Sequence, residues 1–151
     1  MNIELRTIDA ANKDAVIALT VHDNQKAFIA SNARSLETAL EEENREIARP
    51  FAIYAEDRLV GFCMFAFEPD AEDEDDRYWL WRFMIDRQEQ GKGYGQAALA
   101  EIIRYFRDNG ADRLFLSTEP ENECGLHIYH KAGFRETGEF NDDEAILLLT
   151  L

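Results

Sequence analysis

Three closely spaced glycines, Gly91, Gly93 and Gly95, form a segment that could bind phosphate groups. They follow the apolar segment 78–85 and precede apolar residues at helical spacing between Leu99 and Phe106. Backbone N–H groups at a helix N-terminus carry partial positive charge, and glycine lets the chain approach a pyrophosphate closely. The G-x-G-x-G spacing differs from the nucleotide P-loop and from the dinucleotide motif G-x-G-x-x-G. The residues therefore predict either a pyrophosphate loop of another kind or a turn without a ligand.

The histidines and cysteines of the chain do not predict a metal centre. His127 and His130 are three residues apart, but no third ligand is apparent. Cys63 lies in an apolar segment and Cys124 in a polar one, without the spacing of a metal site. We therefore expect no metal and two free thiols in a reducing cytoplasm.

The elements that must position these residues follow from hydrophobic periodicity. The expected order is βααβββαβαββ in a single domain spanning residues 1–151, of mixed α/β (α+β) class with one central sheet. We expect Pro50 to end the second helix, and Asp57 and Arg58 to form a hairpin turn. The expected strands are 3–7, 51–56, 59–68, 78–85, 113–117, 134–140 and 145–151; one later helix follows Gly95 and a short one spans 122–131. The first helix should be capped by Asn12, and the second should run from Leu36 to Ala48 with Ser35 as its cap.

The charge of the 151-residue chain narrows the possible partners. The net charge is −15, which argues against nucleic acid and anionic membrane surfaces, because both require clustered Lys and Arg. It is compatible with a cationic substrate, although acidity alone also serves solubility. The sequence shows neither an apolar run long enough to span a membrane nor a secretory signal, so we expect a cytoplasmic protein.

Two motifs resemble the GCN5-related N-acetyltransferases (GNAT). The first is similar to that family's Q/R-x-x-G-x-G/A signature and reads Gln88-x-x-Gly91-x-Gly93. The second is similar to N-x-x-A-x-x-L-Y-x-x-x-G-F and reads Asn122-x-x-Gly125-x-x-Ile128-Tyr129-x-x-x-Gly133-Phe134. The resemblance implies a GNAT fold, in which helices flank a central mixed, mostly antiparallel sheet, and acetyl-CoA as co-substrate.

Within this family the chain is most similar to the spermidine/spermine (diamine) N-acetyltransferases. The matching stretches are Val21-x-x-x-Gln25-x-x-Phe28-Ile29, Leu59 to Phe62, Trp79 to Asp86 and Gln90 to Gly93. This resemblance implies a polyamine or diamine acceptor and a homodimer. The alternatives are an N-acetyltransferase for a protein N-terminus, a lysine or an aminoglycoside, and a non-catalytic CoA-binding sensor domain.

The resemblance also implies roles for individual residues. Backbone amides of the glycine segment should bind the pyrophosphate, the main chain of 83–85 should pair with the pantetheine arm, and Asn122 should contact CoA near the thiol. The expected CoA-binding residues are Phe83, Met84, Ile85, Gln90, Gly91, Lys92, Gly93, Tyr94, Gly95 and Asn122.

Acetyl transfer to an amine requires a proton donor and a proton acceptor. An amine that attacks a thioester expels a thiolate, and Tyr129, a phenol with an ordinary pKa near 10, is the expected general acid. The base stays open: related polyamine enzymes often carry an acid on the central strand where this chain has Trp81. Asp23, Glu68 or a loop carboxylate could take that role.

The expected acceptor-binding residues are His22, Asp23, Gln25, Phe28 and Trp81. Glutamates between Glu37 and Glu42 and the acidic segment 70–76 could add anionic contacts, or they could simply be solvated.

Overall fold

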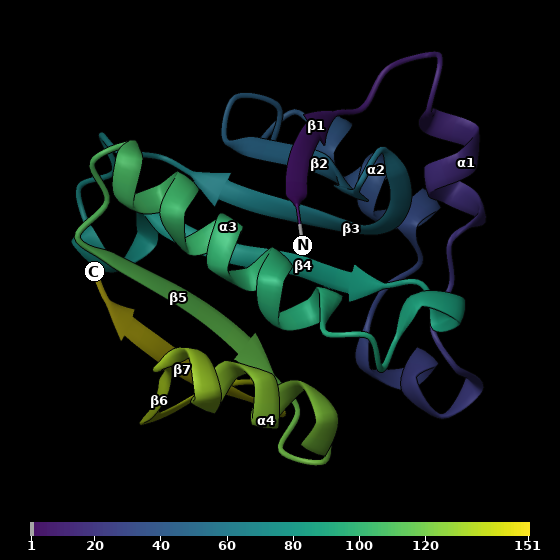
Figure 1. Cartoon of the computed structure of the whole chain (residues 1–151). Helices are drawn as coiled ribbons and strands as arrows, with labels where there is room; N and C mark the ends of the chain where they lie inside the picture. The colour runs from purple at the N-terminus through teal and green to yellow at the C-terminus, as the bar shows by residue number, and fades with distance from the viewer. Residues whose placement is uncertain (1) are drawn as a thin grey trace.

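The computed structural model describes residues 2–151, which form a seven-stranded sheet with the order β1-β2-β3-β4-β5-β7-β6 (Figure 1). Within the described chain β4 and β5 are the parallel neighbours, and every other neighbouring pair is antiparallel. The strands are β1 (Ile3–Thr7), β2 (Ala48–Ala55), β3 (Arg58–Phe67), β4 (Tyr78–Ile85), β5 (Arg113–Thr118), β6 (Arg135–Asn141) and β7 (Glu144–Thr150). The mixed, mostly antiparallel sheet predicted from the sequence is confirmed.

Helices cover both faces of the sheet. In Figure 1, α3 (Tyr94–Asp108) crosses in front of β3 and β4, and α4 (Glu123–Ala132) lies beside it. Both pack on a hydrophobic core that includes Leu99 and Phe106 of α3 and Leu116 of β5. A second, smaller core on the other face joins α1 (Lys13–Ala18) and α2 (Asn32–Leu40) to β3 and β4 through Val16, Phe62 and their neighbours. Along the chain, a short 3₁₀ helix, η1 (Asp23–Phe28), lies between α1 and α2.

The two central strands diverge along their length. The parallel ladder between β4 and β5 is confined to Trp79 and Phe115, whose rings stack with centroids 5.0 Å apart. On the other side of β4, Met64 of β3 pairs with Arg82 while Phe65 pairs with Leu80, so β4 carries a bulge at Trp81. A bulge bends a strand and increases its twist. β4 therefore separates from β5 towards its C-terminal end.

Three expectations about residues 31–58 are wrong. The second helix begins after Ser31, whose Oγ accepts a hydrogen bond from the amide of Arg34 at 3.1 Å, whereas Ser35 is fully buried within the helix. Pro50 does not end this helix but lies inside β2, at a position that pairs with β3 before the ladder to β1 begins, so its missing N–H is tolerated. The hairpin turn is formed by Glu56 and Asp57, which both have positive φ.

Asn12 precedes α1 as predicted, but its side chain does not cap the helix. Its amide instead donates to the carbonyl of Thr7 at 3.1 Å and accepts from the backbone of Asp9 at 2.9 Å. The last two strands join through the short turn at Asp142, which has φ of 52°. In the described part of the chain, no helix is long and apolar enough to cross a membrane.

Candidate active site

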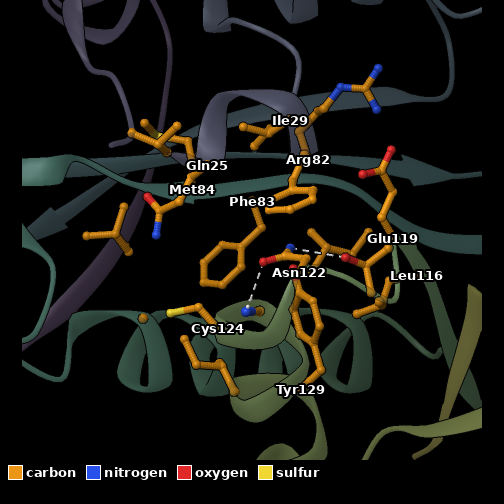
Figure 2. Close-up of a pocket in the computed structure, with 18 of the residues that line it drawn as sticks. Gln25, Ile29, Arg82, Phe83, Met84, Leu116, Glu119, Asn122, Cys124 and Tyr129 are labelled. Carbon is orange, nitrogen blue, oxygen red and sulfur yellow. Dashed lines mark hydrogen bonds between the residues drawn. The ribbon is translucent and has the colours of Figure 1, made fainter. Parts of the chain in front are cut away.

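A cleft of about 570 Å³ lies where β4 and β5 separate. Its walls come from the C-terminal halves of these strands, the segment 25–30, the glycine segment and the start of α4. Figure 2 shows Arg82 and Ile29 on one side of the cleft and Tyr129 and Cys124 on the other. The divergence of β4 and β5 thus opens the sheet between its two faces.

Two residues of the glycine segment have backbone conformations that favour glycine. Gly91 and Gly93 have φ of 78° and 87°, which glycine adopts without strain, and Gly93 is the N-cap residue of α3. Nothing lies within 4 Å of the place where a Cβ of Gly91 would stand, so its backbone is open to a ligand. A Cβ at Gly95 would meet Ile128 of α4 at 3.2 Å. Gly91 and Gly95 both line the cleft, so the N-terminus of the 15-residue helix α3 faces it.

The side chains of the glycine segment make different contacts. Gln90 lines the cleft and donates to the carbonyl of Ile85 at 2.9 Å, and it also hydrogen bonds to Gln25 of η1. Lys92 points away to an ion pair with the buried Glu89 at 3.1 Å, and Tyr94 packs on the core. Gln90, Gly91 and Gly95 line the cleft, while Lys92, Gly93 and Tyr94 stand beside it.

Strand β4 and the start of α4 supply the next predicted residues. Phe83, Met84 and Ile85 all line the cleft. Asn122 is the N-cap of α4: its Oδ1 accepts from the amide of Gly125 at 3.2 Å, and its Nδ2 donates to Thr118 at 3.1 Å. The cap fixes the start of α4 against the end of β5, which places the N-terminal turn of the helix at the cleft.

Tyr129 lies one turn further along α4 and lines the same cleft. Its ring packs against Phe83 and Phe134, with centroids 6.4 and 6.1 Å away. Burial raises the pKa of the Tyr129 hydroxyl to about 12, because the phenolate would lose its hydration. The hydroxyl makes no hydrogen bond within residues 2–151. It is therefore a protonated donor at neutral pH with its hydrogen-bonding capacity free for a ligand.

Only some of the residues predicted to bind the acceptor lie in the cleft lining. Gln25, Phe28 and Trp81 line the cleft. His22 and Asp23 are exposed and outside its lining, and Asp23 forms an ion pair with Lys26 at 2.9 Å. A hydrogen bond from Lys26 lowers the pKa of the Asp23 carboxyl.

Besides Thr118, four polar residues of the lining have no counterpart in the sequence predictions. They are Arg82 of β4, Ser117 and Glu119 in and after β5, and Glu144 of β7. Ser117 donates to Glu144 at 2.9 Å, and the Nε of Arg82 is buried without a hydrogen-bond partner in the described structure. No motif marks Glu144, because its position depends on the pairing of β7 with β5.

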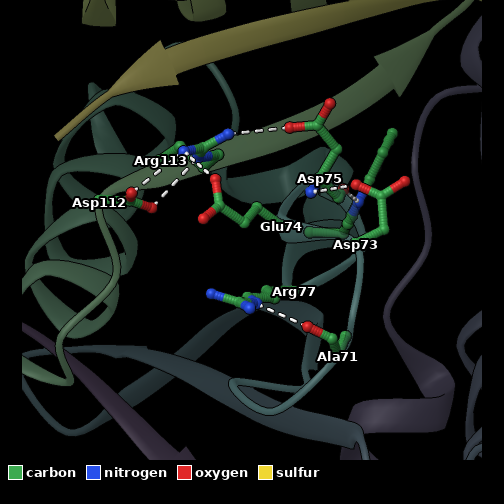
Figure 3. Close-up of polar contacts among 8 residues, drawn as sticks. Ala71, Asp73, Glu74, Asp75, Arg77, Asp112 and Arg113 are labelled. Atoms are coloured by element: carbon green, nitrogen blue, oxygen red, sulfur yellow. Dashed lines mark hydrogen bonds and ion pairs between the residues drawn. The ribbon is translucent and has the colours of Figure 1, made fainter.

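The acidic segment 70–76 lies away from the cleft. Figure 3 shows Glu74 and Asp75 directed towards Arg113 of β5, with nitrogen–oxygen distances of 3.1 and 2.9 Å. Arg77 donates to the carbonyl of Ala71 at 2.8 Å, which closes the base of the segment. The glutamates of α2 are likewise outside the cleft lining, where Glu37 and Glu41 pair with Arg34.

The cysteines are free, and burial raises the pKa of the Cys63 thiol well above its ordinary value. Cys124 is exposed and lines the cleft at the start of α4. Glu68, at the end of β3, does not line the cleft. Among residues 2–151 no group of three or more His, Cys, Asp or Glu side chains could hold a metal ion.

The sequence model of the acetyltransferase (GNAT) family matches residues 11–134. The spermine/spermidine N(1)-acetyltransferase of Bacillus subtilis (strain 168) is 32% identical over 97% of this chain and 98% of its own length. The chain belongs to the GNAT acetyltransferase family. The prediction made from the two motifs is confirmed, and the protein is an acetyl-CoA-dependent N-acetyltransferase.

Solved structures of GNAT enzymes share the fold of this chain. Spermidine N-acetyltransferase from Vibrio cholerae, in complex with CoA and spermine, has a TM-score of 0.74 and 18% identity, covering 98% of this chain and 95% of that one. An aminoglycoside acetyltransferase in complex with coenzyme A has a TM-score of 0.78 and 14% identity, covering 99% of this chain and 95% of that one. Enzymes with different acceptors thus match equally well, so the fold alone does not select the acceptor.

Proposed function

We propose that this GNAT enzyme acetylates a primary amine of a polyamine or diamine, by direct transfer from acetyl-CoA with Tyr129 as general acid. The observation that carries the acceptor class is the 32% identity to a spermine/spermidine N(1)-acetyltransferase over nearly the whole chain. The cleft adds support, because Glu119 and Glu144 line it and a carboxylate attracts an ammonium group. The net charge of −15 favours the approach of a polycation.

Acetyl-CoA is the co-substrate, and the residues around the cleft suit its parts. The backbone amides at Gly91 and the N-terminus of α3 would bind the pyrophosphate, and the main chain of β4 at 83–85 would pair with the pantetheine arm. Tyr129 would then donate its proton to the thiolate as the C–S bond breaks. Cys124 stands near the expected thiol position, but Cys63 is buried, and direct transfer requires neither thiol.

The test is CoA release from acetyl-CoA against a panel of amines: spermidine, spermine, putrescine, a lysine peptide, a free N-terminal peptide and an aminoglycoside. Saturable release with half-saturation in the micromolar-to-millimolar range for a polyamine, and at least tenfold lower kcat/KM for the peptides, is the expected result. Preference for a peptide or an aminoglycoside would overturn the acceptor class. CoA binding without release for any amine would instead favour a sensor domain.

We also propose that the enzyme acts in the cytoplasm, where acetyl-CoA is available, and that it forms a homodimer. Sedimentation equilibrium tests the second point, since a monomer has a mass of 17.4 kDa. A species of that mass at micromolar concentration would contradict the homodimer.

A further inference from the structure

Glu144 is the first residue of β7 and lines the cleft. Its neighbour Ala145 packs in the core under α3 and α4, as does Leu147 two residues later. Successive side chains of a strand point to opposite faces, so Glu144 projects to the other face of the sheet. Tyr129 of α4 belongs to the core side. A carboxylate and a phenol thus approach the opening between β4 and β5 from opposite faces.

Ser117 holds this carboxylate at the point where the strands separate. Its Oγ donates to Oε1 of Glu144 at 2.9 Å. The ladder between β4 and β5 is confined to Trp79 and Phe115, and Ser117 is the next residue of β5 on the same face as Phe115. The Ser117–Glu144 pair therefore stands at the first position beyond the ladder, where a group could pass between the strands.

Arg82 faces the same opening from β4. The bulge at Trp81 shifts the alternation of β4, and Arg82 lines the cleft with its Nε buried and unpartnered within the described chain. Burial lowers the pKa of the Arg82 guanidinium, and the charge of Glu144 opposes this shift. Arg82 and Glu144 thus both line the cleft, one from β4 and the other from β7. Glu119 also lines the cleft, but among the described residues no side-chain hydrogen bond fixes it.

We infer that Glu144, oriented by Ser117, is the proton acceptor for the incoming amine, an inference that rests on the proposed amine acetyltransferase function. A primary amine with a pKa near 10.4 is almost wholly protonated at neutral pH and cannot attack. One oxygen of Glu144 accepts from Ser117, and its other oxygen makes no hydrogen bond within residues 2–151. That oxygen is free to receive the ammonium group. Trp81 stands where related polyamine enzymes often carry an acid, and its side chain cannot act as a base. Glu144 supplies the base instead.

The proton and electron balance is complete without a further reactant. Glu144 takes one proton from the ammonium group, and the freed nitrogen lone pair forms the bond to the thioester carbonyl carbon. The C–S bond breaks, and its electron pair leaves on sulfur, which takes the proton of Tyr129. The nitrogen loses its second proton, which restores Tyr129 through solvent, and Glu144 releases its proton to solvent. The products are the acetamide, CoA thiol and one proton.

The experiment compares Glu144→Gln with the wild type in the acetylation of spermidine between pH 7 and pH 9. Glutamine can still accept the hydrogen bond from Ser117 but cannot take a proton. The readouts are kcat/KM, the Kd for acetyl-CoA and Tm. Glu139→Gln on β6 is the matched control, since its side chain is exposed and makes no contact with the cleft.

At pH 7 the kcat/KM of Glu144→Gln should fall at least about 100-fold, the usual contribution of a general base, while Kd and Tm stay unchanged. The variant can use only neutral amine, so its kcat/KM should rise about tenfold per pH unit, and the wild type should rise much less. Tyr129, with a pKa raised to about 12, does not titrate in this range. The other titratable groups that line the cleft are Arg82, Glu119 and Cys124.

Two results would overturn the inference. A loss in Glu144→Gln without the steep pH dependence would show that the carboxylate only attracts the substrate. Wild-type behaviour of Glu144→Gln would also overturn it, and a further variant, Glu119→Gln, would then assign the base to Glu119 if it showed the steep dependence. The wild-type rate with spermidine reports on the proposed function and the ratio of variant to wild type on Glu144, so each can fail separately.

Discussion

Replacement of Tyr129 by phenylalanine isolates the hydroxyl that we assign as general acid. The ring contacts with Phe83 and Phe134 remain, and no protein group of the described chain loses a hydrogen-bond partner. The free energy of unfolding should therefore change by less than about 1 kcal/mol. The affinity for acetyl-CoA should be unchanged.

The size of the rate effect follows from the environment of the hydroxyl. Burial raises the pKa of Tyr129 to about 12, whereas a thiol in water has a pKa near 8.5. Proton transfer to a hydrated thiolate would thus be uphill by about 3.5 units, or about 4.8 kcal/mol. The same cleft desolvates the departing thiolate and raises its proton affinity, which narrows this gap. We expect kcat to fall about 100-fold, at the lower end of general acid catalysis, which corresponds to about 2.7 kcal/mol.

The assay is thiol release under saturating acetyl-CoA and amine, together with calorimetric titration of acetyl-CoA. Tyr78→Phe is the matched control, because Tyr78 of β4 is buried in the core and does not line the cleft. The control should retain the wild-type rate. Near-full turnover of Tyr129→Phe would refute the role of the hydroxyl, and a loss explained wholly by weaker acetyl-CoA binding would reduce it to a binding contact.

Three further predictions concern stability. Because the pKa of Tyr129 is about 12 in the folded protein and near 10 in the unfolded chain, the folded state binds more protons between these values, and stability should fall as pH rises from 10 to 12. Tyr129→Phe should lack this part of the decline, which is at most about 2.7 kcal/mol over the whole range and less where water reaches the cleft; urea unfolding at pH 9 and pH 11 measures about half of it. Gly61→Ala would place a Cβ 2.4 Å from the carbonyl oxygen of Met84, so it should destabilise by about 2–3 kcal/mol in urea unfolding, whereas Gly110→Ala, with open space and φ of +88°, should cost only about 1 kcal/mol. Arg113→Gln should lower stability by less than about 1 kcal/mol, because its ion pairs are exposed, yet limited proteolysis should cleave segment 70–76 faster; an unchanged cleavage rate would contradict the role of Arg113.

The sequence correctly predicted the elements whose structure depends on local chemistry. The glycine segment was predicted between a strand and a helix, and positive φ at Gly91 and Gly93 is a requirement that glycine meets locally. The helix expected over residues 122–131 is present as α4, and Asn122 is its N-cap. The order of strands and helices along the chain was also predicted from hydrophobic periodicity, because a strand and an amphipathic helix differ in the spacing of their apolar residues.

Predictions from local conformational preference failed at Ser35 and at Pro50. Ser31 and Ser35 are both good N-caps, but Ser35 is fully buried inside α2 and Ser31 caps the helix. Pro50 ends helices by its local preference, yet here it fits a strand position paired on one side only. In both cases tertiary packing outweighed the local conformational preference.

The sequence by itself determined the family, the glycine segment before α3 and the tyrosine at the cleft, because these depend on short motifs whose residues lie close together in the chain. Only the tertiary structure brought Glu144 of the last strand to Ser117 and faced both with Arg82. That meeting depends on the pairing of β7 with β5, on the alternation of side chains in each strand and on the bulge in β4. Such register is a property of the assembled sheet, since a shift by one residue would turn Glu144 to the other face.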